Sequence, residues 1–499
     1  MVAKLNKVAF EDALTMTGFS KFNYYVFLLC SSIIMGMSFE VYSVSYLVPA
    51  SVCELDTSSS QQGLMAATPL IGIIATSHIW GYLADTRGRK KVLCTSMFLG
   101  FITGALAALS PNWIVFSVLK LCSSSAVSGC FALSISLLSE CTPVKRRNTL
   151  ILLTSSVFMS CTGIMAVVAI PVLRLDFSYH LPFLDIQFNS WRLLNLIYTI
   201  PCAISSIGLL FAYESPKYLL SVGDQANAMK ILREIFAINN AKDGDLYPVN
   251  SVVLEEDQAA NIEGFWASIK AQTVPLLRPP LLFNTLILAA MFVTVYLSIN
   301  PFIVWMPFLV DNFMKSIQGG ADGLSFCEMM RAAQNDTETH VIETCALNNT
   351  AMILVFATGM VLAVISVFMS MLINCLGRKN LLIGLQVFAG VSALCLNFSY
   401  SWILSAILFV GFISGTLNFG LLSSFSVDLF PTYVKAMGVC LTLMVGRGSG
   451  VFGINLVKNL LDSNCEVSFY IFGSIACLGG VIGFLLPSDK KLSDRNKLV

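Results

Sequence analysis

The chain has 499 residues, of which 56% are hydrophobic and only 12% are charged, with a formal net charge of +1. Soluble globular domains carry about twice that share of charged residues. The composition therefore excludes an ordinary water-soluble enzyme and indicates a protein that crosses a membrane several times.

Long apolar runs with no charge or a single one recur along the whole chain, and each can cross a hydrocarbon core of about 30 Å as a helix. The predicted spans are residues 24–50, 63–80, 92–109, 113–138, 149–173, 193–213, 281–309, 351–376, 381–398, 402–427, 436–457 and 467–486. The alternating pattern of barrel strands is absent, so helices are the remaining way to satisfy backbone polar groups in lipid. We predict an all-α membrane protein with twelve transmembrane helices.

The chain begins with a polar stretch, residues 1–23, which carries acids and no small-residue cleavage site before the first apolar run. We therefore predict no removable signal peptide. With both termini assigned to the cytoplasm, most of the 30 lysines and arginines fall in the tails and loops of that side. Residues 1–23 and 487–499 are accordingly predicted to be cytoplasmic tails.

A polar segment, residues 214–280, follows the sixth span. Ser215 and Pro216 are typical of a helix cap followed by proline at the first helical position, and Asp224 is typical of the next cap. The pattern predicts two short cytoplasmic helices. We expect the apolar face of the second helix to lie on the membrane or on the helical bundle.

The loop between the seventh and eighth spans, residues 310–350, is predicted to face the outside or a vesicle lumen. It contains glycosylation sequons at Asn335 and Asn348 and two cysteines, Cys327 and Cys345. We predict glycosylation at these asparagines, although Asn348 lies close to the eighth span, and a disulfide between the two cysteines. Free cysteines are the alternative.

Two patterns occur twice at nearly the same interval. The first pattern is GRK, at residues 88–90 and 377–379. The second pattern is an acid followed by a proline three residues later and a base four residues after the proline, at residues 140–147 and 428–435. Two unrelated patterns with one offset indicate an internal repeat. The predicted repeats are two parallel six-helix halves, residues 24–213 and 281–486.

Several stretches carry a family resemblance. The arrangement of six plus six spans, GYLADTRGRKK after the second span, SECTPVKRR after the fourth and ESPKYLL after the sixth resemble the major facilitator superfamily. Within it, VYSVSYLVPASVCELD, FNSWRLLNLIYTIP and DLFPTYVKAMGV resemble the synaptic vesicle glycoprotein 2 group, which is similar to the organic ion transporters. The loop between the seventh and eighth spans is much shorter than the lumenal domain typical of the vesicle glycoproteins. The resemblance implies transport by alternating access.

The GYLADTRGRKK stretch contains an acid, which the positive-inside rule does not require. Asp85 can accept hydrogen bonds from Arg89 and from a neighbouring helix N-terminus, which predicts a cytoplasmic latch that holds one state of the cycle. We expect Gly81 and Gly88 to let the backbones approach and turn, and the second half to have a weaker latch, because Asn374 stands near the acid's place. The predicted latch residues are Gly81, Asp85, Gly88, Arg89, Glu140 paired with Arg147, and Glu214.

Three charges lie within predicted spans, where a charge is costly and so often marks a transport pathway. They are Glu40, Lys120 and Arg447, each on a stripe of small or polar residues. We predict that they bind substrate or couple its transport, and the alternative is a structural ion pair between Glu40 and Lys120. The resemblance to organic ion transporters implies that a base at Arg447 favours anions. His78 is expected to be a packed histidine rather than a proton relay.

The polar segments contain no metal-ligand spacing, phosphate-binding glycine loop or nucleophile elbow, and the basic clusters are only as long as loops. We therefore predict no enzyme activity, no cofactor and no nucleic-acid partner. Two functions remain: a secondary transporter of a small organic solute, with a proton as a candidate coupling ion, or a vesicle-membrane receptor or scaffold without much transport. The protein is expected to be a monomer in the plasma membrane or in a secretory or synaptic-like vesicle.

Overall fold

The computed structural model describes residues 7–254, 270, 273–320, 323–339, 348–430 and 434–487. Twelve of the helices in this part of the chain are long and apolar enough to cross a membrane, which confirms the predicted all-α class and number of spans. The first half contains α2 (Lys21–Tyr42), α3 (Val44–Leu55), α4 (Ser59–Arg87), α5 (Arg89–Ala107), α6 (Trp113–Val127), α7 (Cys130–Glu140), α8 (Val144–Leu173) and α9 (Ser190–Phe211).

The second half repeats this arrangement with more breaks within its spans. Its elements are α13 (Leu282–Ser298), α14 (Asn300–Val304), α15 (Met306–Gln318), α16 (Phe326–Thr339), α17 (Asn349–Leu376), α18 (Arg378–Leu396), α19 (Trp402–Ile413), η2 (Ser414–Leu417), α20 (Asn418–Leu429), α21 (Lys435–Ser463) and α22 (Cys465–Gly483). Pro301 and Pro307 lie in the first turns of α14 and α15. Because proline lacks a backbone N–H, the seventh span is divided at these points.

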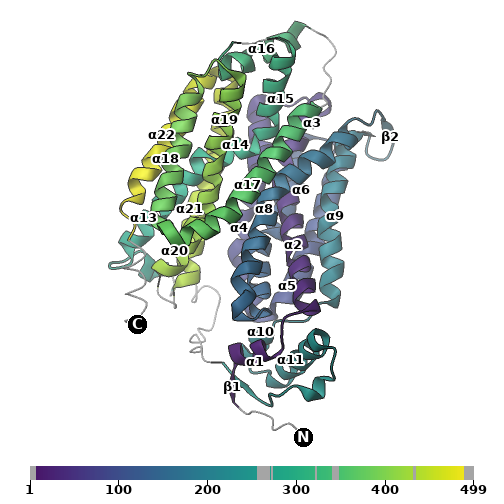
Figure 1. Ribbon diagram of the computed structural model, residues 1–499. Helices are drawn as coiled ribbons and strands as arrows, with labels where there is room; N and C mark the ends of the chain where they lie inside the picture. The colour runs from purple at the N-terminus through teal and green to yellow at the C-terminus, as the bar shows by residue number, and fades with distance from the viewer. Residues whose placement is uncertain are drawn as a thin grey trace.

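The two halves lie side by side, the first in purple to teal and the second in green to yellow (Figure 1). Helix α8 packs on α17 and α4 packs on α21, and these two pairs form most of the interface, to which α3 and α15 also contribute. A Cβ atom on Gly359 of α17 would lie 3.1 Å from the backbone nitrogen of Gly163 on α8. The glycines therefore allow these two backbones to approach closely.

The GRK repeat has the same structural role in both halves. Gly88, between α4 and α5, and Gly377, between α17 and α18, both adopt positive φ, 98° and 77°, at the turn between the second and third spans of their half. After each turn, a lysine reaches the end of the last helix of its half. Lys90 Nζ donates to the Leu210 carbonyl oxygen at 3.1 Å, and Lys379 Nζ donates to the Phe484 carbonyl oxygen at 2.8 Å. A lysine near the negative end of a helix satisfies carbonyls that the helix leaves free.

The start of the chain folds together with the linker. Strand β1 (Val8–Ala9) pairs in parallel with β4 (Val252–Val253), and α1 (Phe10–Met16) packs on α11 (Gln225–Asn240), close to α10 (Pro216–Ser221) and η1 (Gly244–Leu246). Met229 and Leu232 of α11 are buried against Phe10 and Leu14 of α1. The expectation that this face of α11 lies on the membrane or the bundle is therefore wrong, because the start of the chain covers it.

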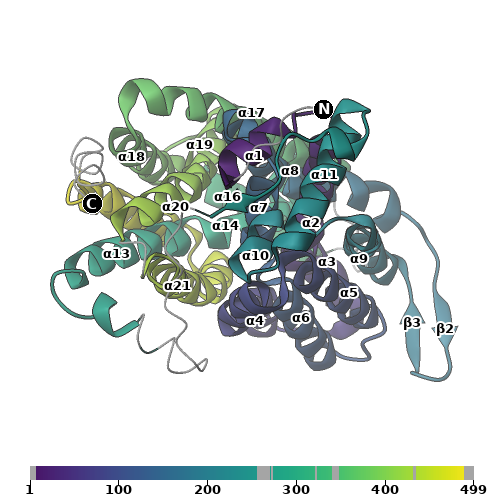
Figure 2. The same ribbon diagram turned by 90° about the horizontal axis from the view of Figure 1, so that it is seen from below.

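The linker module, formed by β1, α1, α10, α11, η1 and β4, lies below the first half on the side where the ends of α9 and α22 also lie (Figure 1). We call this the terminal side and the opposite one the distal side. On the distal side a short hairpin of β2 (Tyr179–Leu181) and β3 (Ile186–Phe188) joins α8 to α9. It extends sideways from the bundle in both views (Figures 1 and 2).

Candidate functional site

The two charges predicted in the first and fourth spans form a buried ion pair. Lys120 Nζ lies 3.2 Å from Glu40 Oε2, and the two side chains are 1% and 0% exposed. Ser123, one helical turn after Lys120 on α6, donates to the same carboxylate oxygen at 2.5 Å. The small residue at Gly104 makes room for this carboxylate, because a Cβ atom there would overlap it. The pair therefore lies inside the first half, between α2, α5 and α6.

The Glu40 carboxylate is incompletely paired. Its Oε1 atom is buried and has no hydrogen-bond partner among the described residues. A buried carboxylate oxygen without a donor is costly. The ion pair is therefore buried but only partly satisfied by the described residues.

Arg447 lies away from this pair, on α21 at the interface between the halves. Its side chain is half-buried and forms no ion pair or hydrogen bond with any residue that the structure describes. Arg447 lies within electrostatic range of Tyr42 on α2 and of His78 on α4. Tyr42 in turn lies within that range of Tyr296 on α13. We call these four residues the central cluster. It combines one permanent positive charge with two phenols and an imidazole.

Further aromatic rings flank the central cluster. The rings of Tyr296 and Phe419 are 4.5 Å apart, and those of Tyr42 and Phe158 are 6.3 Å apart. These residues come from both halves and none is fully exposed. An aromatic surface beside an arginine suits a ligand with an apolar body and an anionic group. Sequence reasoning missed this set, because aromatic residues are frequent throughout apolar spans and only the fold brings these ones together.

The three predicted charges thus do not form one site. The structure brings Glu40 and Lys120 together within the first half, and it places Arg447 between the halves. His78, predicted to be a packed histidine, is half-buried and lies within electrostatic range of Arg447. The geometry separates a buried ion pair within the first half from a cluster around one arginine at the interface of the halves.

On the terminal side, Arg89 lies between two acids. Its guanidinium is 3.3 Å from the Asp85 carboxylate and 3.4 Å from the Glu140 carboxylate. The Asp85 side chain is 74% exposed, so its own pair with Arg89 contributes little to stability. Arg89 also stacks on the Tyr218 ring at 5.1 Å. The cluster joins α4, α5, α7 and α10.

Glu214 completes this cluster through backbone contacts. Its carboxylate accepts from the Lys90 backbone nitrogen at 2.9 Å, at the start of α5, where a negative charge is favoured. A Cβ atom on Gly88 would overlap this carboxylate, and Gly88 also has positive φ. Glycine is therefore required at this position for two separate reasons. Burial raises the pKa of Tyr218, with the Glu214 carboxylate as a second cause, so its hydroxyl remains a donor to the Thr86 carbonyl oxygen at 3.0 Å.

Two details of the predicted latch are wrong. Arg147 does not pair with Glu140; it donates to Glu11 of α1 at 2.6 Å, and so attaches the linker module to α8. Gly81 allows no close approach, because a Cβ atom there would meet nothing within 4 Å. The side chain of Asn374, near the acid's place in the second half, lies outside the described part of the structure.

A second buried network lies on the distal side. Arg192 on α9 is fully buried and its Nη2 lies 2.6 Å from Glu54 Oε1 on α3. Its Nη1 donates to the carbonyl oxygens of Ala108 and Ser110, each at 2.8 Å. Trp191 Nε1 donates to the other oxygen of Glu54 at 2.6 Å. The network fixes the distal ends of the first, third and sixth spans, and it was missed because both charges fall just outside the predicted apolar runs.

The disulfide in the distal loop joins a different pair of cysteines from the predicted one. Cys327 on α16 is bonded to Cys465 at the start of α22, with Cα atoms 5.6 Å apart, so the pairing with Cys345 is wrong. Cys345 lies outside the described residues, and so does the side chain of Asn335. Asn348 caps α17 by accepting from the Thr350 backbone nitrogen at 2.9 Å, which occupies its side chain.

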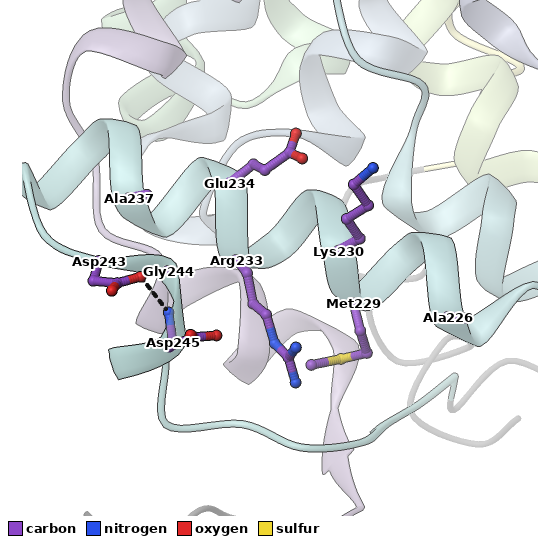
Figure 3. A pocket seen from close by; sticks show the side chains of 9 residues that line it. All are labelled: Ala226, Met229, Lys230, Arg233, Glu234, Ala237, Asp243, Gly244 and Asp245. Atoms are coloured by element: carbon purple, nitrogen blue, oxygen red, sulfur yellow. Dashed lines mark hydrogen bonds between the residues drawn. The ribbon is translucent and has the colours of Figure 1, made fainter.

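The linker module has an open pocket of about 300 Å³ between α11 and η1 (Figure 3). Its lining residues are Ala226, Met229, Lys230, Arg233, Glu234, Ala237, Asp243, Gly244 and Asp245. The Asp243 carboxylate accepts from the Asp245 backbone nitrogen at 3.1 Å, so one acid serves the turn itself. The pocket carries charges of both signs and lies outside the candidate spans. No group of three or more metal-binding side chains occurs within the described ranges.

Comparison with known proteins gives consistent relationships. The sequence profile described as Major Facilitator Superfamily matches residues 28–330. Human synaptic vesicle glycoprotein 2B is 25% identical over 334 residues, which cover 61% of this chain and 47% of that relative. The chain thus spans about half the length of this relative. The protein svop-1 of Caenorhabditis elegans, whose name describes a transporter, is 22% identical over 96% of this chain and 85% of its own.

Two further similarities concern transporters. Organic cation/carnitine transporter 7 of Arabidopsis thaliana is 25% identical over 46% of this chain and 44% of its own. The partially occluded inward-open structure of the xylose transporter XylE from E. coli superposes with a TM-score of 0.67 at 15% identity, over 94% of this chain and 100% of that one. Together with the two halves and the twelve spans, the profile match over more than half of the sequence identifies a multi-pass integral membrane protein. This chain belongs to the Major Facilitator Superfamily.

Proposed function

We propose that the protein is a secondary active transporter that moves a small organic anion by alternating access. The observation that carries this proposal is the half-buried Arg447, which lies between the halves without an acidic partner among the described residues. A buried charge without a counter-ion is unfavourable. A bound anion would supply that counter-ion.

The chemistry of the central cluster suggests what the anion looks like. Arginine presents a planar fork that binds carboxylate, sulfate or phosphate groups with two hydrogen bonds, and it keeps its charge when buried. Tyr42 and Tyr296 add aromatic surface and hydroxyl donors from opposite halves. Because the site draws on both halves, its affinity for the substrate must change as the halves move, which a transport cycle requires.

The ion pair of Glu40 and Lys120 is the proposed coupling site. The two opposite charges attract each other while Lys120 is close, as here, and separation of α6 from α2 would leave both charges buried without a partner. A coupling proton would act at this pair, so its movement would be linked to the position of α6 relative to α2. The structural role that we considered from the sequence is compatible with this, because a pair can hold the helices in one state and release them in another.

The sides of the membrane follow from the same proposal. We place both termini, the linker module and the cluster around Arg89 in the cytoplasm, and the distal loop with Asn335 outside or in a vesicle lumen. The plasma membrane and a secretory or synaptic-like vesicle are both consistent with this orientation. Close contacts between the halves, such as Gly63 with Asn455 and Gly163 with Gly359, lie in the distal part of the spans. The latch residues lie at the opposite end.

The similarity to synaptic vesicle glycoprotein 2B supports a second candidate, a membrane receptor or scaffold with little transport. The name of the plant relative describes a carrier of organic cations, which Arg447 would repel. A thermal-shift screen of purified protein against organic anions, cations, sugars and nucleotides separates these functions. Stabilisation by anions supports our proposal, stabilisation by cations alone contradicts the anion assignment, and no response to any solute favours the scaffold.

A further inference from the structure

The hairpin between α8 and α9 has two chemically different faces. Its cross-strand pairs are Tyr179 with Phe188, His180 with Gln187 and Leu181 with Ile186. Since side chains alternate between the faces of a strand, the two outer pairs share one face and the middle pair lies on the other. One face is therefore apolar and aromatic, and the other is polar.

The polar face is internally satisfied. Ser178 Oγ donates to Gln187 Oε1 at 2.9 Å, and the Gln187 amide lies 3.3 Å from His180 Nδ1. His180 Nε2 in turn lies 3.8 Å from the Asp185 carboxylate. These four side chains are exposed. Such a surface is suited to water.

The protein covers the apolar face only in part: Ile186 is buried and Leu181 and Phe188 are half-buried, but two aromatic rings of the hairpin are exposed. Phe183 at the turn is 96% exposed and Tyr179 is 67% exposed. A two-stranded hairpin is marginally stable by itself in water, and here it extends beyond the bundle, next to α9 (Figures 1 and 2). The hairpin needs a surface against which its aromatic side chains can pack.

Helix α9, which begins at the hairpin, has an exposed apolar stripe along its second half. Ile200, Ile204, Ile207 and Phe211 follow one another there at intervals of a helical turn and are exposed, from 46% to 74%, so this helix lies at the outside of the bundle. This stripe belongs to a candidate span, and the hairpin begins where the distal end of that span meets the water. The hairpin projects sideways at the level where α8 and α9 end, and so extends over the lipid that surrounds them (Figure 1).

From this placement we infer that the hairpin is a membrane-interface anchor that lies in the plane of the distal leaflet, with Phe183 and Tyr179 among the lipid head groups and the His180–Gln187 face in water. Aromatic side chains favour this zone, because one end of the ring is apolar and the zone itself is partly hydrated. An amphipathic element in this position buries its apolar face by about 5–10 Å. The inference does not depend on the substrate, the transport direction or the sidedness of the protein.

Two single-cysteine additions test it. Phe183→Cys and the matched control Gln187→Cys place a thiol on the apolar turn and on the polar face, and the exposure of both positions means that neither change removes packing within the bundle. Each variant is labelled with an environment-sensitive fluorophore and reconstituted at low protein density into phosphatidylcholine vesicles. Labelled wild-type protein supplies the background from its native cysteines.

The label at 183 should emit at shorter wavelength than the label at 187. It should be quenched by lipids that carry a spin label near the head group, and quenched about threefold less by aqueous iodide, because a site 5–10 Å into the interface is shielded from the ion. Equal iodide quenching at the two positions in these vesicles overturns the inference. Shielding at 183 that develops only at high protein density, or only in cell membranes, also overturns it, because the covering surface would then be a second copy or another protein.

Discussion

Removing Lys120 while leaving Glu40 in place is the sharpest test of the buried pair. Both side chains are essentially unexposed and lie 3.2 Å apart, and Glu40 Oε1 already lacks a partner among the described residues. Lys120→Met would leave the carboxylate with Ser123 as its remaining donor in the described structure. Breaking a buried pair in this way costs about 3–5 kcal/mol. We expect a loss of stability of that size.

The double variant Glu40→Gln with Lys120→Met should recover most of this loss, since replacing both charges removes the unpaired one. Unfolding by denaturant in mixed micelles at neutral pH measures each variant. A loss below about 1 kcal/mol for Lys120→Met, or a double variant as unstable as the single one, would refute this account of the pair.

Three further predictions concern other parts of the chain. The variant Asp85→Asn should reach the membrane normally but slow the transport cycle, because it removes one of the two ion pairs of Arg89 and leaves the pair with Glu140. Transport at the wild-type rate would mean that the GYLADTRGRKK stretch serves only the positive-inside topology. Tyr247→Phe should destabilise the linker module by about 1 kcal/mol, seen as faster proteolysis near residue 250, because its buried hydroxyl donates to the Ala13 carbonyl oxygen at 2.6 Å; unchanged proteolysis would contradict the docking of α1. Glycosidase treatment of cell-expressed protein should sharpen its band on a gel, and Asn335→Gln should abolish this effect. If the band does not change, and a cysteine introduced at Ser251 reacts with a reagent that cannot cross the membrane, the proposed orientation of the protein is reversed.

The spans could be predicted from the sequence because bilayer thickness fixes the length of an apolar helix, whatever its neighbours are. The repeat was also visible, and the structure gives its reason, since Lys90 and Lys379 reach equivalent helix ends. The ion pair of Glu40 and Lys120 was considered from the sequence because charges within a span need partners. These features depend on local sequence or on a strong physical cost.

The missed features depend on contacts between distant parts of the chain. Phe10 packs on α11 more than two hundred residues later, and no local pattern predicts such a contact. Cys327 bonds to Cys465 rather than to the cysteine near it in sequence, and cysteine connectivity does not follow from spacing. Strands of three residues between two spans carry too little periodicity to distinguish the hairpin from a loop.

Arg192 shows how a boundary error hides a site. The predicted sixth span begins one residue after it, so this fully buried arginine was not counted among the intramembrane charges. The structure begins α9 at Ser190 and pairs Arg192 with Glu54. Helix ends are uncertain by a few residues in any prediction from sequence, and charges concentrate at those ends.

Calorimetric binding of an anionic solute from the screen to the wild type and three variants tests the central claim most directly. The variants are Arg447→Lys, Arg447→Ala and, as a control that removes a positive charge from the linker module, Arg233→Ala. We predict that Arg447→Lys binds about tenfold more weakly, because lysine keeps the charge without the fork, that Arg447→Ala loses measurable binding, and that Arg233→Ala binds as the wild type does. Binding by Arg447→Ala as tight as that of the wild type would show that Arg447 is a structural residue, and would contradict the assignment of an organic anion as the substrate.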